Sequence, residues 1–258
     1  MMQTLSVISL VIFSFVTILF IISLMIKRND IADIAWGPGI FLVALTAYIS
    51  NPLNSTVLNI MLLLIFVWAA RLSIRIFSRN IKKTEDYRYK QWREEWGKWF
   101  YIRSYMQVYL LQGFLMIVVG YSFVHASIYL VGSSLGLVSL AGVLVWAVGF
   151  YFESVGDWQL DRFIKNKPQQ REILKTGLWK YTRHPNYFGE VTMWWGIWLV
   201  TAGVPMSYIA LVSPLAITFL ILKVSGIPML EKKFEGNLAF EEYKKKTSAF
   251  FPLPKKTK

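Results

Sequence analysis

The feature that most constrains this chain is a set of long, uninterrupted apolar runs. Seven of them approach or exceed the roughly 20 residues that an α-helix needs to cross a bilayer. They cover residues 5–26, 34–50, 56–77, 105–127, 129–152, 187–203 and 205–225. Open structures other than helices leave backbone polar groups unpaired in lipid, which is too unfavourable to persist. We therefore predict an all-α, polytopic membrane protein with seven transmembrane helices.

Two further observations support this fold class. The chain is 55% hydrophobic and 16% aromatic, which is more than a water-exposed exterior of 258 residues accommodates. The first apolar run has no basic residue before it and no small-residue cleavage pattern after it, and it ends at Lys27-Arg28. We expect this run to be a retained membrane anchor and not a signal peptide.

The positions of the basic residues predict the orientation. With seven crossings, one face of the membrane receives residues 27–33, 78–104, 153–186 and 226–258. Every Lys and Arg lies in these segments or at the adjoining end of a crossing, and the loops of the opposite face contain none. Because Lys and Arg concentrate in cytoplasmic loops, we expect an outside N-terminus and a cytoplasmic C-terminus.

This asymmetry also accounts for the formal net charge of +13, so we do not expect nucleic acid as a partner. The absence of cysteine excludes disulfides and thiolate sites, and one histidine on the charged face is too few for a metal centre. His125, near the uncharged face, is given no role. We expect a monomer in contact with membrane lipids, built as one domain with residues 1–127 and 128–258 as its halves.

The densest cluster of functional groups lies at residues 177–190. Within it, Arg183-His184-Pro185-Asn186 begins a predicted helix. Pro185 suits the first helical turn, and the free amides after it form a natural anion site beside Arg183. Asn186 and Glu190 are four residues apart and share a helix face, so one ligand can touch both. Glu190 is the acidic residue that enters a predicted crossing, which marks it as a functional candidate.

A second cluster follows the third apolar run. Arg71, Arg75 and Arg79 recur every four residues, as membrane anchoring explains. Anchoring does not require the acidic pair Glu85-Asp86 that precedes two tyrosines. This pair is a candidate for binding ribose hydroxyls or an adenine amine.

A third group brackets the charged loop before residue 177. Glu153 and Asp157 are four residues apart, and Arg162 and Arg171 follow them. Such a loop is often only solvated, but its place directly before the anion-suited helix favours a polar cofactor pocket. The C-terminal segment alternates charged and aromatic residues from Glu231 onward, as an amphipathic lid on the membrane surface does.

At these residues the sequence resembles a known family. Gly177-Leu178-Trp179 followed by the run from Arg183 to Glu190 resembles the C-terminal signature of the steroid 5α-reductase family, and of its bacterial branch in particular. Similar patterns span most of the chain: Asp33 to Gly37, Arg79-Asn80, Glu85 to Tyr89, Leu111-Gln112-Gly113, Gly156-Asp157 and the tail from Glu231 through Tyr243 to Pro252.

The resemblance implies a seven-helix membrane reductase in a bacterial inner membrane. Such an enzyme takes NADPH from the cytosol and reduces a carbon–carbon double bond conjugated to a carbonyl in a lipophilic substrate. Asp33 matches a carboxylate that grips the ketone in steroid-reducing members, whereas Trp68 stands where a tyrosine is expected. A steroid-like or an isoprenoid-like substrate therefore stays open. Asp33, Tyr87 and Tyr89 are the candidates for proton chemistry.

The residue clusters and the resemblance together give one set of predicted cofactor contacts. In that family, the positions matching Asp157, Arg171, Tyr181, Asn186 and Glu190 hold NADPH. The full set is Arg79, Asn80, Glu85, Asp86, Gln112, Asp157, Arg162, Arg171, Tyr181, Arg183, His184, Asn186, Tyr187, Glu190, Glu231 and Tyr243.

Two alternatives remain. The Arg-His-Pro-x-Tyr signature also occurs in isoprenylcysteine and phospholipid methyltransferases, whose C-terminal halves are similar and bind S-adenosylmethionine. A membrane methyltransferase of a lipid or isoprenoid is therefore the rival interpretation. A non-catalytic lipid-binding or transport protein is the third, although no internal repeat is visible and no charged residue lies at mid-membrane, where transporters place their coupling sites.

Overall fold

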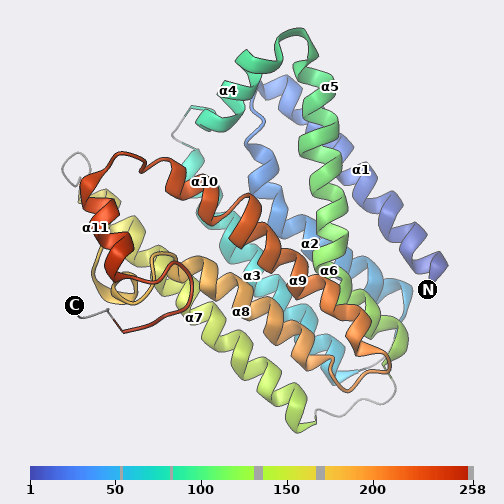
Figure 1. The fold of residues 1–258 in the computed structure, drawn as a ribbon. Helices are drawn as coiled ribbons and strands as arrows, with labels where there is room; N and C mark the ends of the chain where they lie inside the picture. Colours follow the sequence, from blue (N-terminus) through green and yellow to red (C-terminus); the bar gives the residue numbers. More distant parts are fainter. Residues whose placement is uncertain (53–54, 82–83, 131–135, 167–171, 255–258) are drawn as a thin grey trace. The chain divides into compact units, whose positions relative to one another are not determined.

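The computed structural model of the chain describes all residues except 53–54, 82–83, 131–135, 167–171 and 255–258. Every regular element among the described residues is helical (Figure 1). In chain order the elements are α1 (Met2–Ile26), α2 (Ile31–Ser50), α3 (Thr56–Asn80), α4 (Tyr87–Trp96), η1 (Gly97–Trp99), α5 (Phe100–Ser104), η2 (Tyr105–Leu110), α6 (Leu111–Tyr129), α7 (Leu137–Lys165), η3 (Gly177–Lys180), α8 (Pro185–Val200), η4 (Ser207–Leu211), α9 (Val212–Phe219), η5 (Leu220–Val224), α10 (Ile227–Lys232) and α11 (Leu238–Lys246).

Six helical segments of the described chain are long and apolar enough to cross a membrane. They are Met2–Ile26, Ile31–Ser50, Thr56–Asn80, Tyr87–Tyr129, Leu137–Lys165 and Ser207–Lys232. The predicted crossing at residues 187–203 corresponds to α8, which has 16 residues. At 1.5 Å per residue α8 is about 24 Å long, against a hydrocarbon core of about 30 Å. The chain is therefore an integral, multi-pass membrane protein with at least these six candidate crossings.

Two predicted helix boundaries were wrong. The apolar run at 129–152 does not form one helix from its first residue, because Tyr129 ends α6 and the next helix begins at Leu137. That helix also continues to Lys165, well beyond residue 152. Hydropathy marks where the surrounding solvent changes, whereas the backbone hydrogen bonds of α7 continue through its charged end.

The chain divides into two compact units. Unit 1 comprises Met1–Leu135 and Gly203–Ser213, and unit 2 comprises Gly136–Ala202 and Pro214–Lys258. Each unit contains one of the polar clusters expected from the sequence.

In unit 1, α2 packs against α1, α3 and α6 (Figure 1). The contact with α3 is close, since a Cβ at Gly37 would lie 2.9 Å from the carbonyl oxygen of Ala69. Ser73 of α3 donates a hydrogen bond of 2.9 Å to the carbonyl of Ile34. The apolar interior of the unit includes the fully buried side chains of Ile40 and Trp68. This packing fixes the start of α2, which carries Asp33.

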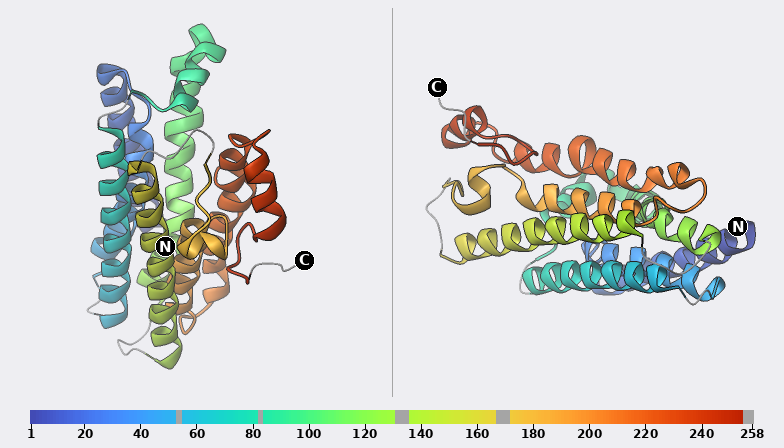
Figure 2. Two further views of the ribbon diagram at one scale, coloured as in Figure 1. Left: turned by 90° about the vertical axis from the view of Figure 1, so that its left-hand side faces the viewer. Right: turned by 90° about the horizontal axis from the view of Figure 1, so that it is seen from below.

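In unit 2, α7 and α8 run side by side at very short distance (Figure 2). Glycines recur every seven residues on both helices and bring the two backbones together. A Cβ at Gly149 would lie 2.6 Å from the carbonyl oxygen of Gly189, a distance that real side chains do not adopt. This approach places the polar end of α7 directly against the first turn of α8.

Candidate functional site

The segment before α8 is held on α7 by side-chain bonds. Gly177 has φ of 61°, a left-handed conformation that glycine adopts without strain. The side chain of Gln159 accepts a 3.0 Å hydrogen bond from the backbone N–H of Leu178. The indole N–H of Trp179 donates a 3.0 Å bond to the carbonyl of Gly156. The motifs at Gly156-Asp157 and Gly177-Leu178-Trp179 are thereby brought into one site, through contacts that span 19 and 23 residues of sequence.

The guanidinium of Arg183 contacts the C-terminal segment. Its Nε donates to Oε1 of Glu231 at 2.9 Å, and Nη1 donates to the carbonyl oxygen of Thr247 at 2.6 Å. The residue is only 9% exposed. The charge of Arg183 is therefore compensated by a carboxylate of the chain itself.

His184 is buried beside this ion pair. Its Nε2 lies 2.9 Å from the same Glu231 oxygen, and its Nδ1 is buried without a hydrogen-bond partner. Burial lowers the pKa of His184, against the opposing effect of Glu231. A neutral ring that donates from Nε2 leaves Nδ1 as a free acceptor. Tyr187 stacks on the ring, with centroids 5.5 Å apart.

Asp157 and Asn186 join α7 to the first turn of α8. The Nδ2 of Asn186 donates a 3.1 Å hydrogen bond to Oδ1 of Asp157, whose side chain is nearly fully buried. The other amide atom of Asn186, Oδ1, is buried and has no partner. Glu153, one helical turn before Asp157, is also buried. The start of α8 thus combines buried carboxylates with acceptor atoms that lack donors.

The C-terminal segment closes one side of this site. The backbone N–H of Arg183 donates to the carbonyl of Ser248 at 2.9 Å, and that of Leu253 donates to the carbonyl of Tyr181 at 3.0 Å. Burial raises the pKa of Tyr243, whose hydroxyl donates to the carbonyl oxygen of Trp179. The segment lies on the residues that precede α8. The predicted amphipathic lid on the membrane surface stays a prediction.

Other predicted contacts in unit 2 lie at its periphery. Arg162 is exposed and stands over the ring of Trp158 at 5.6 Å, and Tyr181 is 42% exposed. Glu190 is partly exposed on the second turn of α8. Arg171 lies outside the described residues.

Unit 1 contains the second polar site, at the start of α2. The hydroxyl of Tyr89 donates a 2.8 Å hydrogen bond to Oδ1 of Asp33, and Nη2 of Arg88 contacts Oδ2 of Asp33 at 2.5 Å. Tyr89 is 2% exposed. The structure therefore brings together two of the three residues predicted for proton chemistry. Tyr87, the third, is 46% exposed at the start of α4.

The acidic pair after α3 makes contacts that hold α4 in place. Asp86 caps α4 by accepting a 3.0 Å bond from the backbone N–H of Arg88. Glu85 accepts bonds from the backbone of Asn29 at 2.8 Å and from Arg93 at 3.1 Å. Their predicted role in holding a nucleotide stays a prediction.

The remaining predicted contacts of unit 1 are dispersed. Arg79 is exposed, and the carbonyl of Asn80 accepts a 3.2 Å bond from Arg28. Gln112 is partly exposed on α6. No group of three or more metal-ligating side chains occurs within the described ranges.

Sequence reasoning did not single out Arg88, Asn29 or Thr247. Arg88 stands between two tyrosines that were predicted, so its position in that motif was the available signal. Asn29 and Thr247 contribute through contacts with partners more than 50 residues away, for which the sequence gives no local signal.

One family model matches residues 19–247, which is most of the chain, and it is described as a protein of unknown function, DUF1295. This chain belongs to the DUF1295 family. Searches of curated proteins and of solved structures give no match for this DUF1295 chain. The matched range includes both polar sites.

Proposed function

We propose that this chain is a membrane-embedded, NADPH-dependent reductase of a conjugated carbon–carbon double bond in a lipophilic substrate. One observation carries the proposal. Asn186 bonds to the buried carboxylate of Asp157 while its Oδ1 stays buried and without a donor. An unsatisfied buried acceptor costs roughly 1–3 kcal/mol, so the site favours a ligand that brings N–H or O–H donors. The carboxamide and ribose hydroxyls of NADPH are such donors.

The chain's own residues divide the work in this proposal. When bound, NADPH supplies the hydride. Unit 2 binds and orients it through Asp157, Asn186 and the acceptor nitrogen of His184. In unit 1, the hydroxyl of Tyr89 holds a proton 2.8 Å from Asp33, and this pair is the candidate acid for the substrate. The apolar early helices are proposed to hold the lipophilic part of the substrate, which is steroid-like or isoprenoid-like.

A second function has one observation in its favour. Arg183 is occupied by Glu231 and by the carbonyl of Thr247, so its charge is not directed to a phosphate. A site lined by carboxylates and acceptors also suits the ammonium group of S-adenosylmethionine. A lipid or isoprenoid methyltransferase is therefore the rival proposal. The reductase is preferred because Asn186 after Pro185 and the acid Glu190 resemble the reductase pattern. Gly156-Asp157 and Leu111-Gln112-Gly113 also resemble reductase elements outside the part shared with the methyltransferases.

The placement in the membrane is part of the proposal. We infer seven crossings, with α8 as the sixth, an outside N-terminus and a cytoplasmic C-terminus. The distribution of Lys and Arg supports this orientation. We propose a bacterial inner membrane, because the resemblance is to the bacterial branch of the reductase family. We also propose that the protein is a monomer.

Thermal unfolding with each cofactor tests the function. A ligand at 100 times its Kd stabilises the native state by about 2.7 kcal/mol. We expect NADPH to raise the melting temperature of the purified protein and S-adenosylmethionine to leave it unchanged. Asn186→Ala should abolish the NADPH shift, while Asn59→Ala, at an exposed asparagine of α3, should retain it.

The opposite outcomes are equally informative. A shift with S-adenosylmethionine alone would favour the methyltransferase. A shift with neither cofactor would favour the non-catalytic interpretation. An unchanged NADPH shift in Asn186→Ala would show that the cofactor does not bind at the start of α8.

A further inference from the structure

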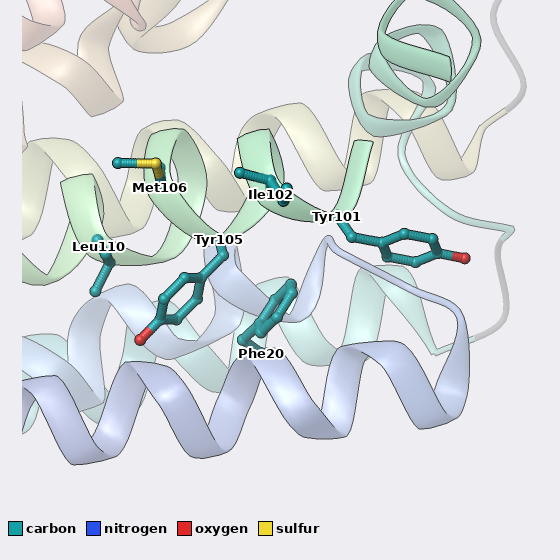
Figure 3. Close-up of a pocket in the computed structure, with 6 residues that line it drawn as sticks. All are labelled: Phe20, Tyr101, Ile102, Tyr105, Met106 and Leu110. Atoms are coloured by element: carbon teal, nitrogen blue, oxygen red, sulfur yellow. The ribbon is translucent and has the colours of Figure 1, made fainter. Parts of the chain in front are cut away.

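An apolar pocket in unit 1 lies apart from both polar sites. Its volume is about 380 Å³, and it is formed between α1 and the consecutive segments α5 and η2 (Figure 3). It is lined by Phe20, Tyr101, Ile102, Tyr105, Met106 and Leu110. Neither the proposed cofactor site nor the pair of Asp33 and Tyr89 uses any of these side chains.

The pocket has a defined wall on the side of α1. The hydroxyl of Tyr105 lies 2.9 Å from Oγ1 of Thr17, which ties η2 to α1. The rings of Phe20 and Tyr105 lie next to each other (Figure 3). Their centroids are 4.9 Å apart. Both hydroxyls are satisfied by this bond, so the polar atoms of Tyr105 and Thr17 do not call for a polar ligand.

A local change of helix type shapes the other wall. Residues Tyr105–Leu110 form a π-helical turn between α5 and α6. Such turns are rare, are wider than α-helix and occur often at functional sites. The turn lies within Tyr87–Tyr129, a segment long and apolar enough to span the membrane. Where this part of the segment crosses the membrane, the pocket opens to lipid.

The exposed edge of the pocket is apolar as well. Ile102 and Met106 are 57% and 58% exposed. In a bilayer these side chains face hydrocarbon, and the flexible Met106 adapts to an irregular chain. From Tyr101 to Leu110 the segment rises about 13 Å at 1.5 Å per residue. Half of a bilayer core is about 15 Å, so the pocket matches the length of one acyl chain in one leaflet.

The charge at one end of the pocket indicates the headgroup. Residues 87–104 contain five basic side chains, of which Arg88 and Arg93 are paired with carboxylates outside this range. The other three basic side chains are Lys90, Lys98 and Arg103. Lys98, which precedes the first lining residue Tyr101, is exposed, and its Nζ lies 5.7 Å from the ring of Trp99. Arg103 is also exposed and lies within the first part of the lining segment. Basic and tryptophan side chains in this arrangement are typical of the membrane–water interface and attract anionic headgroups.

We propose that this pocket binds an acyl chain of an anionic membrane phospholipid, with the headgroup at Lys98 and Arg103. The chain lies between Phe20 and Met106. Side chains leave a space open between α1 and the π-helical turn, and the bound lipid fills this space. This assignment does not depend on the proposed enzymatic function.

Photolabelling tests the assignment directly. The full-length protein is reconstituted into nanodiscs with phosphatidylglycerol that carries a diazirine on its acyl chain. After irradiation, mass spectrometry should locate the label on residues 101–110 and on Phe20. Phosphatidylcholine with the same chain should label these residues several-fold less. Lys98→Gln combined with Arg103→Gln should remove that preference.

Two further variants separate filling of the pocket from general effects. Leu110→Trp places a large ring in the pocket and should abolish the labelling. Leu10→Trp, on the lipid-exposed face of α1 where the native side chain is 66% exposed, should leave it intact. Thermal unfolding midpoints of both variants near that of wild type establish that they are folded.

Three results would overturn the assignment. These are equal labelling in Leu110→Trp and Leu10→Trp, equal labelling by the two phospholipids, or displacement of the label by an enone-bearing lipophilic molecule. The last result would make the pocket a site for the proposed substrate. The cofactor experiment with Asn186→Ala is independent of all three.

Discussion

Glu231 joins two buried side chains of the C-terminal half. One of its oxygens receives both Nε of Arg183 and Nε2 of His184 at 2.9 Å. Arg183 and Glu231 side chains are only 10% and 16% exposed. Removing one partner of a buried ion pair leaves an uncompensated charge, which costs roughly 3 kcal/mol.

Glu231→Gln is therefore expected to destabilise unit 2 by about that amount, measured as a lower midpoint of thermal unfolding in detergent. Glu241→Gln is the matched control, because Glu241 is 46% exposed and its ion pair with Lys244 spans 3.5 Å. An exposed pair contributes little. Equal effects of the two substitutions would contradict the central role of Glu231.

His184 makes the stability of the protein depend on pH. Burial lowers its pKa in the folded state. In the unfolded chain the pKa of this histidine is about 6.5. As the pH falls through that value, the unfolded chain takes up a proton that the folded chain does not. Stability should therefore fall between pH 7.5 and pH 5.5. In His184→Gln this decrease should be smaller, and unfolding midpoints that decrease equally in both proteins would refute the assignment.

At this scale the sequence predicts which residues are polar and close in the chain. The motif from Arg183 to Glu190 was found in this way, whereas Asp33 and Tyr89 were named as separate candidates, Asp33 through the family resemblance. It does not predict the partners, because Arg183 and Glu231 are 48 residues apart and Asp33 and Tyr89 are 56 apart. Such contacts depend on how the helices pack.

At the scale of elements, the contact between α7 and α8 positions Asp157 against Asn186. Gly149→Val should separate the helices, because even a Cβ there would lie 2.6 Å from the carbonyl of Gly189. We expect a destabilisation of roughly 3 kcal/mol, measured by thermal unfolding. Gly203→Ala is the control, since a Cβ at that position meets nothing within 4 Å. A tolerated valine at 149 would disprove this close packing.

The helices themselves could be predicted better than their ends. The first three apolar runs correspond to α1, α2 and α3 within a few residues. The extension of α7 to Lys165 could not be predicted from hydropathy, because Glu153, Asp157 and Asp161 are polar yet compatible with helix. The π-helical turns at Tyr105–Leu110 and Leu220–Val224 leave no mark in an apolar run either.

At the scale of the whole molecule, the number of crossings determines where the termini lie. An odd number places them on opposite sides of the membrane and an even number places them on the same side. We expect a green fluorescent protein fused to the C-terminus to fluoresce, and a tag at the N-terminus to be accessible to protease added to spheroplasts. Termini on one side would exclude α8 as a crossing.

The shortness of α8 has a consequence for the membrane around it. Where α8 crosses as proposed, its length of about 24 Å falls short of the surrounding hydrocarbon. The bilayer accommodates such a mismatch by thinning, which draws headgroups and water inward. A thinner hydrocarbon layer near α8 would shorten the distance between the water phase and the bilayer interior. A water-soluble reactant and a lipid-soluble one could then meet at the same depth.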